Sequence, residues 1–281
     1  MSGTLFVVAT PIGNLEDLTP RARQTLAIVD LIAAEDTRHT GRLLSHFAIK
    51  TPLLALHDHN EQKVVAALIT DLEEGKSVAL VSDAGTPLIS DPGYRIVQAA
   101  HRHGVTVTPV VGASALTAAL SVAGLATDRF CFEGFLPAKS KARRDRLAEL
   151  SNEPRTIVLY ESVHRIHDCL VDLVAACGES RPAFLGRELT KLHEQCVHAT
   201  LGELLHDVAD GTIMAKGEFV VVVAGSPEVV GSSIDIDRLL VELNVRLPAK
   251  EVAKIVSVAT GEKRNTLYRR LLKLNTEADP D

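Results

Sequence analysis

The stretch LVSDAGTPLISDPG, residues 80–93, decides how the first half of this sequence is interpreted. An apolar run ends abruptly at Ser82-Asp83, and a loop rich in Gly and Pro, with a second acid at Asp91, precedes the next helical pattern. Small and conformationally special residues at this density are typical of a loop whose backbone approaches a ligand. We therefore interpret residues 82–93 as one wall of a cofactor pocket.

The rest of the first half alternates strand and helix patterns. Apolar strands are expected at 4–9, 31–35, 52–56, 77–82 and 105–111, and helices at 40–47, 61–74, 92–103 and 113–123, with one more opened by Thr19 and Pro20. Strands with little polar alternation, separated by helices, indicate a parallel sheet covered on both faces.

The second half indicates a different sheet and then a helical tail. Strands are expected at 129–135, 156–160, 182–189, 196–201 and 217–225, and the pair at 182–201 has no helix between its members, which favours a partly antiparallel sheet. Helices at 235–243, 249–258 and 263–274, with a turn at Gly261, have the outline of a helix-turn-helix. The predicted fold class is α/β, with α/β lobes at 1–125 and 126–225, followed at 226–281 by a linker and a small basic helical RNA-binding domain.

Composition restricts the class of protein. Of the 281 residues 46% are hydrophobic and 23% are charged, which is typical of an ordinary folded protein. Trp is absent, so we expect a core made mainly of aliphatic side chains. No apolar run approaches the roughly 20 residues of a spanning helix, and no signal peptide is recognisable, so we expect a cytoplasmic protein without a membrane partner. The cysteines are far apart and form no CxxC pair, which predicts neither a zinc site nor a disulfide framework: Cys131, Cys169, Cys177 and Cys196.

Four polar loops follow the strands of the first half: VATPIGNLEDLT, AAEDTRHT, VSDAGTPLISDPG and VVGASAL. In a parallel sheet such loops converge at the carboxyl ends of the strands, where ligands bind. A dinucleotide site is one alternative, because Glu35 and Asp36 follow Gly13 at about the ribose-binding spacing. The first loop is not GxGxxG, Pro11 removes a donor there, and no Walker A motif occurs, so this alternative is disfavoured.

Four longer motifs carry a resemblance to a known family: TLFVVATPIGNLEDLTPRA, AAEDTRHTGRLL, LVSDAGTPLISDPG and VVGASALTAALSVAG. In this order, over about residues 3–225, the chain resembles the tetrapyrrole methylase superfamily, and within it the members that methylate ribosomal RNA. Where tetrapyrrole-modifying members resemble GAGPGD and GGDP, this chain has ATPIGN and VSDAGTP, which disfavours a tetrapyrrole substrate.

The resemblance implies a function and a cofactor. It implies a homodimer that uses S-adenosyl-L-methionine to methylate the ribose 2′-oxygen of a cytidine in the decoding region of small-subunit ribosomal RNA, as free RNA or as the 30S subunit. A tetrapyrrole methylase of the same fold and a non-catalytic RNA-binding assembly factor are the alternatives. The cofactor contacts that the resemblance and the loop chemistry imply are Pro11, Ser82, Asp83, Ile89, Gly112, Ser114, Ala115, Tyr160 and Glu161.

Methyl transfer requires a group that accepts or weakens the proton of the attacking hydroxyl. The charged candidates at strand ends are Asp36, Arg38, Glu188 and Lys191. Lys191 would act as a base if its pKa were lowered and would hold a phosphate if it were not, whereas Arg38 would bind the RNA backbone. Ordinary surface ion pairs are the alternative for all four.

The net charge of −6 conceals two basic clusters. One lies at 137–146 and the other at 246–273, and we expect them to contact RNA phosphates, the alternative being solvated helix faces. The residues assigned to this contact are Arg143, Arg144, Lys263, Arg264, Arg269 and Arg270. No metal is expected, because His57-Asp58-His59 and the pair His164 and His167 have no third ligand group at a recognisable distance.

Overall fold

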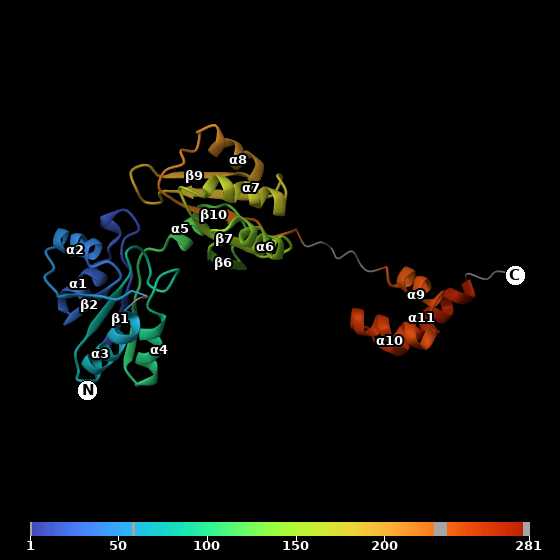
Figure 1. Cartoon of the computed structure of the whole chain (residues 1–281), viewed down its shortest axis with the longest axis horizontal. Coiled ribbons are helices and arrows are strands. Elements are labelled where there is room, and N and C mark those ends of the chain that lie inside the picture. Colours follow the sequence, from blue (N-terminus) through green and yellow to red (C-terminus); the bar gives the residue numbers. More distant parts are fainter. Residues whose placement is uncertain (1, 58–59, 228–234, 278–281) are drawn as a thin grey trace. The chain divides into compact units, whose positions relative to one another are not determined.

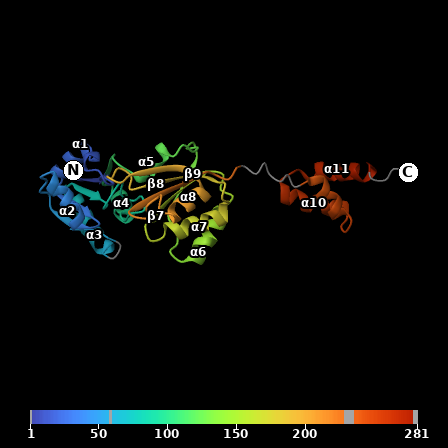
Figure 2. The same ribbon diagram turned by 90° about the horizontal axis from the view of Figure 1, so that it is seen from above.

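The chain folds into two units. The computed structural model describes residues 2–57, 60–227 and 235–277 and separates a larger unit, 1–226, from a smaller one, 227–281. The larger unit holds two five-stranded sheets, one from each predicted lobe (Figures 1 and 2). The predicted α/β class and the helical tail are thus confirmed, and the strands and helices for which ranges are expected differ from those ranges only at their ends; the short 3-10 helix η1 Leu15–Asp17 was not predicted.

The first sheet is entirely parallel, in the order β3-β2-β4-β1-β5. Its strands are β1 Thr4–Val8, β2 Leu31–Ala34, β3 Leu53–Ala55, β4 Val78–Val81 and β5 Thr106–Val110. The helices are α1 Pro20–Ile28, α2 Thr37–His46, α3 Glu61–Glu73, α4 Tyr94–Arg102 and α5 Ala115–Val122. Helices α1 and α2 pack on one face of the sheet and α3 and α4 on the other, so the loops after the strands meet at one edge.

The second sheet is mixed, in the order β6-β7-β10-β8-β9, and only β6 and β7 are parallel. Its strands are β6 Phe130–Phe135, β7 Thr156–Ser162, β8 Pro182–Arg187, β9 Gln195–Thr200 and β10 Glu218–Val223. Helices α6 Ser140–Leu150, α7 Ile166–Cys177 and α8 Leu201–Ala209 cover one face. Helix α5, from the end of the first lobe, covers the other face and so joins the two lobes into one unit.

The smaller unit is a bundle of three helices, α9 Ile236–Asn244, α10 Ala249–Thr260 and α11 Arg264–Glu277. Apolar side chains from all three, among them Leu240, Val252 and Leu267, are fully buried. Gly261 ends α10 with φ of 75°, a left-handed conformation that favours glycine and turns the chain toward α11. Among the described residues, no helix is long and apolar enough to cross a bilayer.

Candidate functional site

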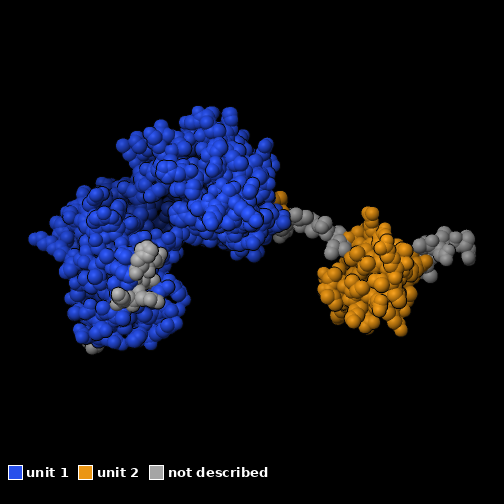
Figure 3. Space-filling view, viewed as in Figure 1, with its two compact units in different colours: residues 1–226 blue, residues 227–281 orange. Residues whose placement is uncertain are grey.

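The loops after β1, β4 and β5 are held together by hydrogen bonds at the carboxyl edge of the first sheet. Thr10 and Gly85 exchange two backbone hydrogen bonds, of 2.8 and 3.0 Å between nitrogen and oxygen. The hydroxyl of Thr86 donates to the carbonyl of Ala113 at 3.0 Å. These contacts fix three loops that are far apart in sequence into one surface, and this surface faces the second lobe across a hollow (Figure 3).

The first cavity in this hollow has a volume of about 520 Å³ and is lined by both lobes. The second lobe contributes Phe135 and Tyr160, whose rings meet edge to face with centroids 5.8 Å apart. The Tyr160 hydroxyl accepts a hydrogen bond of 3.0 Å from the backbone of Leu116, at the start of α5. Burial raises the pKa of Tyr160, so the phenol stays neutral and its ring forms part of the wall.

The charged residues of the first cavity are all acidic. Asp91, Glu161 and Glu218 line it, and none of its lining residues is Lys, Arg or His. Burial, opposed by a hydrogen bond from Ser82 and reinforced by the charge of Asp83, raises the pKa of Asp91 to about 6. Glu161 is already engaged, because its carboxylate accepts from the Ser162 amide at 2.8 Å and pairs with Arg165. The carboxylate of Asp91, with no basic side chain beside it in the lining, therefore makes this cavity suited to a cationic ligand.

A second cavity of about 460 Å³ adjoins the first, and Ile12, Ala84 and Glu218 line both. Its other walls are the first loop, Asp83, one face of α2 and Lys191 from the second lobe. The α2 residues that line it are His39, Arg42, Leu43 and His46. Unlike the first cavity, this one contains basic side chains.

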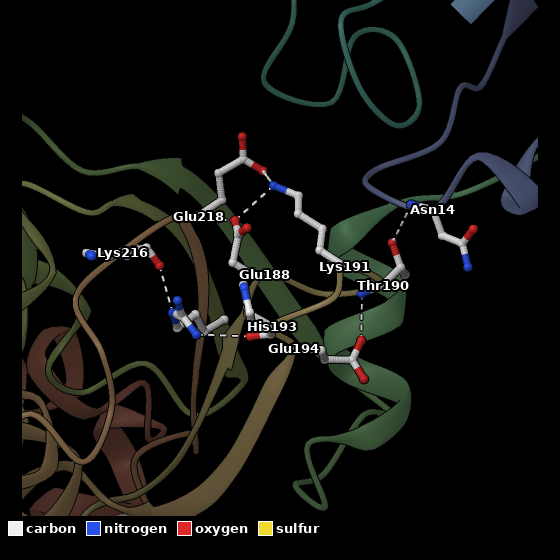
Figure 4. A network of polar contacts seen from close by, with 9 residues as sticks. Asn14, Glu188, Thr190, Lys191, His193, Glu194, Lys216 and Glu218 are labelled. Carbon is white, nitrogen blue, oxygen red and sulfur yellow. Dashed lines mark hydrogen bonds and ion pairs between the residues drawn. The ribbon is translucent and has the colours of Figure 1, made fainter. Parts of the chain in front are cut away.

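The loop after β8 closes the second cavity through a polar network (Figure 4). The ammonium of Lys191 lies 2.8 Å from a carboxylate oxygen of Glu188 and 3.0 Å from one of Glu218. Across the lobes, the backbone N–H of Asn14 donates to the hydroxyl of Thr190 at 3.2 Å. Burial would lower the pKa of Lys191, but the hydrogen bonds to the two carboxylates outweigh it and raise the pKa.

The same network sets the charge of Glu188. Burial would raise the pKa of Glu188, but the hydrogen bond from Lys191 and one from the backbone of Glu218 outweigh it, and the pKa is lowered. Both members of the pair are therefore charged at neutral pH. Of the two roles considered for Lys191, the structure is consistent with a fixed cation and not with a proton acceptor.

Two glycines at this closure lie so close to neighbouring side chains that a Cβ atom would collide with them. A Cβ added to Gly13 would lie 2.3 Å from Cγ of Lys191, and one added to Gly217 would lie 2.3 Å from the carboxyl carbon of Glu188. Gly217 also has φ of +89°, where a side chain is strained. Of the five described non-glycine residues with positive φ, four lie in the two loops that shape the cavities: Leu88, Ser90, Glu188 and Thr190. Such strain is concentrated at functional sites.

The structure separates the nine expected cofactor contacts into three groups. Lining the first cavity are Ile89, Ser114, Ala115, Tyr160 and Glu161. Pro11 and Asp83 line the second cavity instead, and Asp83 accepts a hydrogen bond of 3.0 Å from the amide of Asp36. Ser82 and Gly112 line neither: Ser82 is buried beside Asp91, and a Cβ on Gly112 would lie 3.0 Å from that of Ala9. These two residues lie within the loops and line neither cavity.

The four catalytic candidates are not brought together. Lys191 lines the second cavity with Glu188 behind it, but Asp36 and Arg38 line neither cavity. The Arg38 guanidinium pairs with the Asp36 carboxylate at 2.7 Å, and its side chain is 86% exposed. This hydrogen bond lowers the pKa of Asp36, which also caps α2. The helical period turns Arg38 away from the cavity and places His39, Arg42 and His46 on it.

The basic cluster at 137–146 is smaller than its sequence indicates, which corrects the expected RNA-contact role of Arg143. Arg143 is 4% exposed and pairs with Asp172 of α7 at 2.7 Å, because α6 packs its 143, 147 and 150 face inward. Arg146 is bound by Glu133 and Glu149. Arg144 remains exposed and has no ion pair or hydrogen bond with another described residue.

In the helical unit, the guanidinium of Arg270 is held by an acidic side chain of a neighbouring helix. Its guanidinium donates to the carboxylate of Asp237 in α9 at 2.9 Å, so it stabilises the bundle. Lys263, Arg264 and Arg269 are exposed. No group of three His, Cys, Asp or Glu suited to a metal occurs among the described residues, and Asp58 and His59 of the histidine motif lie outside them.

Sequence reasoning missed several lining residues. Asp91 stands out in the sequence as a second acid in the loop but carried no assigned role, and Phe135 and Glu218 were not considered. The α2 face was missed as well, although its i, i+3, i+7 spacing after the helix cap at Asp36 is visible in the sequence.

Comparisons with known proteins agree with this architecture. Ribosomal RNA small subunit methyltransferase I of Xylella fastidiosa (strain Temecula1) is 53% identical over 267 residues, 95% of this chain and 98% of that protein. The protein of the same name from Escherichia coli O157:H7 is 52% identical over 272 residues, 96% of this chain and 95% of that protein. A solved cobalt precorrin-4 methyltransferase shares the fold with a TM-score of 0.59 at 18% identity, covering 79% of this chain and 94% of that one.

Two family models match the chain. One, described as the RsmI C-terminal HTH domain, matches residues 230–275, which include α9, α10 and all but the last two residues of α11. The other, described as Tetrapyrrole (Corrin/Porphyrin) Methylases, matches residues 4–205, most of the two-lobed unit. Together with relatives about half identical over nearly the whole length, this match shows that the chain belongs to the tetrapyrrole (corrin/porphyrin) methylase family.

Proposed function

We propose that this chain uses S-adenosyl-L-methionine to methylate the ribose 2′-oxygen of a cytidine in the decoding region of small-subunit ribosomal RNA. The observation that carries the proposal is the pair of adjoining cavities, one lined by acids and the other containing basic side chains, in a chain whose relatives are named as ribosomal RNA methyltransferases. A cationic methyl donor fits the first cavity and an anionic RNA strand fits the second.

The lining residues of the first cavity suit the proposed cofactor. S-adenosyl-L-methionine has a sulfonium and an ammonium group, and Asp91 offers a carboxylate without a basic partner in the lining. Apolar and aromatic walls, including Ile89 and Phe135, suit its adenine ring. The volume of about 520 Å³ lies within the roughly 300–1,000 Å³ of small-molecule sites. When bound, this cofactor supplies an electrophilic methyl group, and its loss leaves a neutral thioether.

The chain's own residues position the reactants and handle the proton. Glu218 lines both cavities, and we propose that its carboxylate accepts the proton that the ribose hydroxyl loses as its oxygen bonds to carbon. Lys191 holds that carboxylate at 3.0 Å, and the Asn14–Thr190 contact closes the loops around it. Alignment of the hydroxyl and exclusion of water are then the main contributions of the protein.

The proposal also covers partners and location. The enzyme acts in the cytoplasm on ribosomal RNA or the 30S subunit and forms a homodimer, as the family resemblance implies. Exposed apolar side chains that a second copy would cover include Val111, 74% exposed, and Val122, 53% exposed, at the two ends of the segment from β5 to α5. Light scattering on the purified chain tests the homodimer directly.

Methyl transfer from labelled cofactor tests the function. The pure protein is incubated with 30S subunits from cells that lack it, and the RNA is then hydrolysed with alkali. We expect label in RNA and one alkali-resistant linkage, because a 2′-O-methyl group blocks cleavage at that nucleotide. Label on an added porphyrinoid, or no transfer to RNA at all, would contradict the proposal.

A further inference from the structure

We propose that the second cavity receives the target nucleotide and that one face of α2, formed by His39, Arg42 and His46, binds the RNA phosphates next to it. This inference rests on the proposed function and specifies where the substrate binds. We call these three residues the α2 basic face. All three line the cavity, and all three are exposed, so a strand can reach them from solvent.

The helix itself creates this face. Asp36 caps α2, and residues 39, 42 and 46 then follow at i, i+3 and i+7, one stripe of an α-helix. Leu43 and Leu44 are buried against the first sheet and fix the rotation of the helix. The basic stripe therefore points toward the second cavity as a consequence of how α2 packs.

Charge compensation within the cavity favours an anion at Arg42. The two acids among the lining residues are already engaged: Asp83 accepts from the Asp36 amide at 3.0 Å, and Glu218 pairs with Lys191 at 3.0 Å. Arg42 has no ion pair or hydrogen bond with another described residue. An exposed guanidinium without a partner is suited to bidentate contact with a phosphate.

The relation between the two cavities orients the nucleotide. A phosphate is disfavoured in the first cavity, whose charged lining residues are all acids. With the phosphates on the α2 basic face, the ribose lies toward Ile12, Ala84 and Glu218, the lining that both cavities share. The 2′-hydroxyl then meets the methyl donor at this shared wall, which is the alignment that transfer requires.

Arg42→Gln tests the inference against a matched control, Arg102→Gln. Arg102 is an exposed arginine in the last turn of α4, and because α4 runs back from the carboxyl edge of the sheet, it lies at the opposite edge from the cavities. Labelled methyl transfer to 30S subunits is measured at several salt concentrations, and the cofactor Kd is measured by calorimetry with S-adenosyl-L-methionine.

We expect Arg42→Gln to raise the KM for subunits about tenfold and to reduce its salt dependence, because the variant neutralises one phosphate fewer. The cofactor Kd should stay within twofold of wild type, which also shows that the variant is folded. Arg42→Lys should recover part of the KM, and Arg102→Gln should match wild type. If wild type transfers label but Arg42→Gln keeps the wild-type KM, the inference is wrong; if wild type transfers none, the proposed function itself fails.

Discussion

The two cavities share three lining residues but differ in the charges that surround them. The first contains Asp91, Glu161 and Glu218 and no basic side chain, whereas the second contains Lys191 and the α2 basic face. These linings favour the cationic methyl donor in the first cavity and the anionic RNA strand in the second, as we propose. The difference in charge between the cavities is the observation on which the proposed placement of cofactor and RNA depends.

Of the variants considered, Asp91→Asn should reduce the charge difference between the two cavities with the largest effect on binding. A charge-assisted contact to a ligand contributes about 1.5–3 kcal/mol, so we expect the Kd for S-adenosyl-L-methionine to rise about 10- to 100-fold. Affinity for RNA should be unchanged, because Asp91 does not line the second cavity. Calorimetry with each ligand measures both values. Equal weakening for the two ligands would mean that the loop had simply collapsed.

The pH dependence of cofactor binding follows from the same carboxyl. The pKa of Asp91 is about 6 in the free protein, and a bound cation lowers it, so affinity is full above pH 6 and is lost as pH falls through about 6. Below that pH the Kd should rise by up to about tenfold per pH unit. Asp91→Asn should show a nearly flat profile from pH 5 to 8. A wild-type profile equally flat would contradict the role of Asp91.

Lys191→Met tests the same comparison in the second cavity. The substitution removes a cation from the second cavity and leaves Glu188 and Glu218 without the ammonium between them. We expect the KM for RNA to rise roughly fivefold, because an interaction of about 1 kcal/mol is removed. Cofactor affinity should not weaken, since the first cavity becomes no less acidic. A weaker cofactor Kd with an unchanged RNA KM would reverse the assignment of Lys191.

The helical unit should contribute less than either cavity. Replacing exposed Lys263 and Arg269 with Gln should weaken RNA binding about threefold at low salt and reduce the salt slope by about 0.7–0.9 for each phosphate that the variant no longer neutralises. Arg270→Gln is the contrast, because its partly exposed ion pair with Asp237 links α11 to α9 within the bundle. We expect that variant to lower the melting temperature of the unit. Unchanged RNA affinity in the double variant would exclude these residues from RNA binding.

The smallest expected effect is on stability without cofactor. The folded protein raises the pKa of Asp91 from 3.8 to about 6, so it binds this proton more tightly than the unfolded chain does. Stability then decreases as pH rises from about 4 to about 6, and Asp91→Asn removes that decrease. At pH 7.5 the variant should melt a few degrees higher, because it lacks the partly buried carboxylate whose ionisation costs the folded protein free energy. Differential scanning calorimetry at pH 4.5 and 7.5 checks the sign, and an equal or lower melting temperature at pH 7.5 would contradict it.

Local patterns in the sequence were sufficient for most of the fold. Apolar runs between helical patterns predicted all ten strands, and the missing helix between 182 and 201 predicted the antiparallel pair β8 and β9. Thr19 and Pro20 predicted the start of α1, where the Thr19 side chain accepts from the Ala22 amide. These features depend on neighbours along the chain, which a sequence shows directly.

The direction of individual side chains depended on contacts between distant segments. Asp83 and Asp91 lie in one loop, yet Asp91 lines the first cavity and Asp83 lines the second. Arg143 looked like a surface cation and is buried against Asp172, since α6 packs on α7.

The sequence by itself determined the alternation of strands and helices, the polar loops at the carboxyl ends of the strands and the family to which the chain is similar. Only the tertiary structure decided that the hollow between the lobes is divided into a cavity whose charged lining residues are all acids and one that also contains Lys, Arg and His. The spacing of apolar residues depends only on neighbours along the chain, so it can be seen in the sequence without the fold. The sign of the charge in a cavity is a sum over residues such as Arg42, Lys191 and Glu218, which only folding brings together.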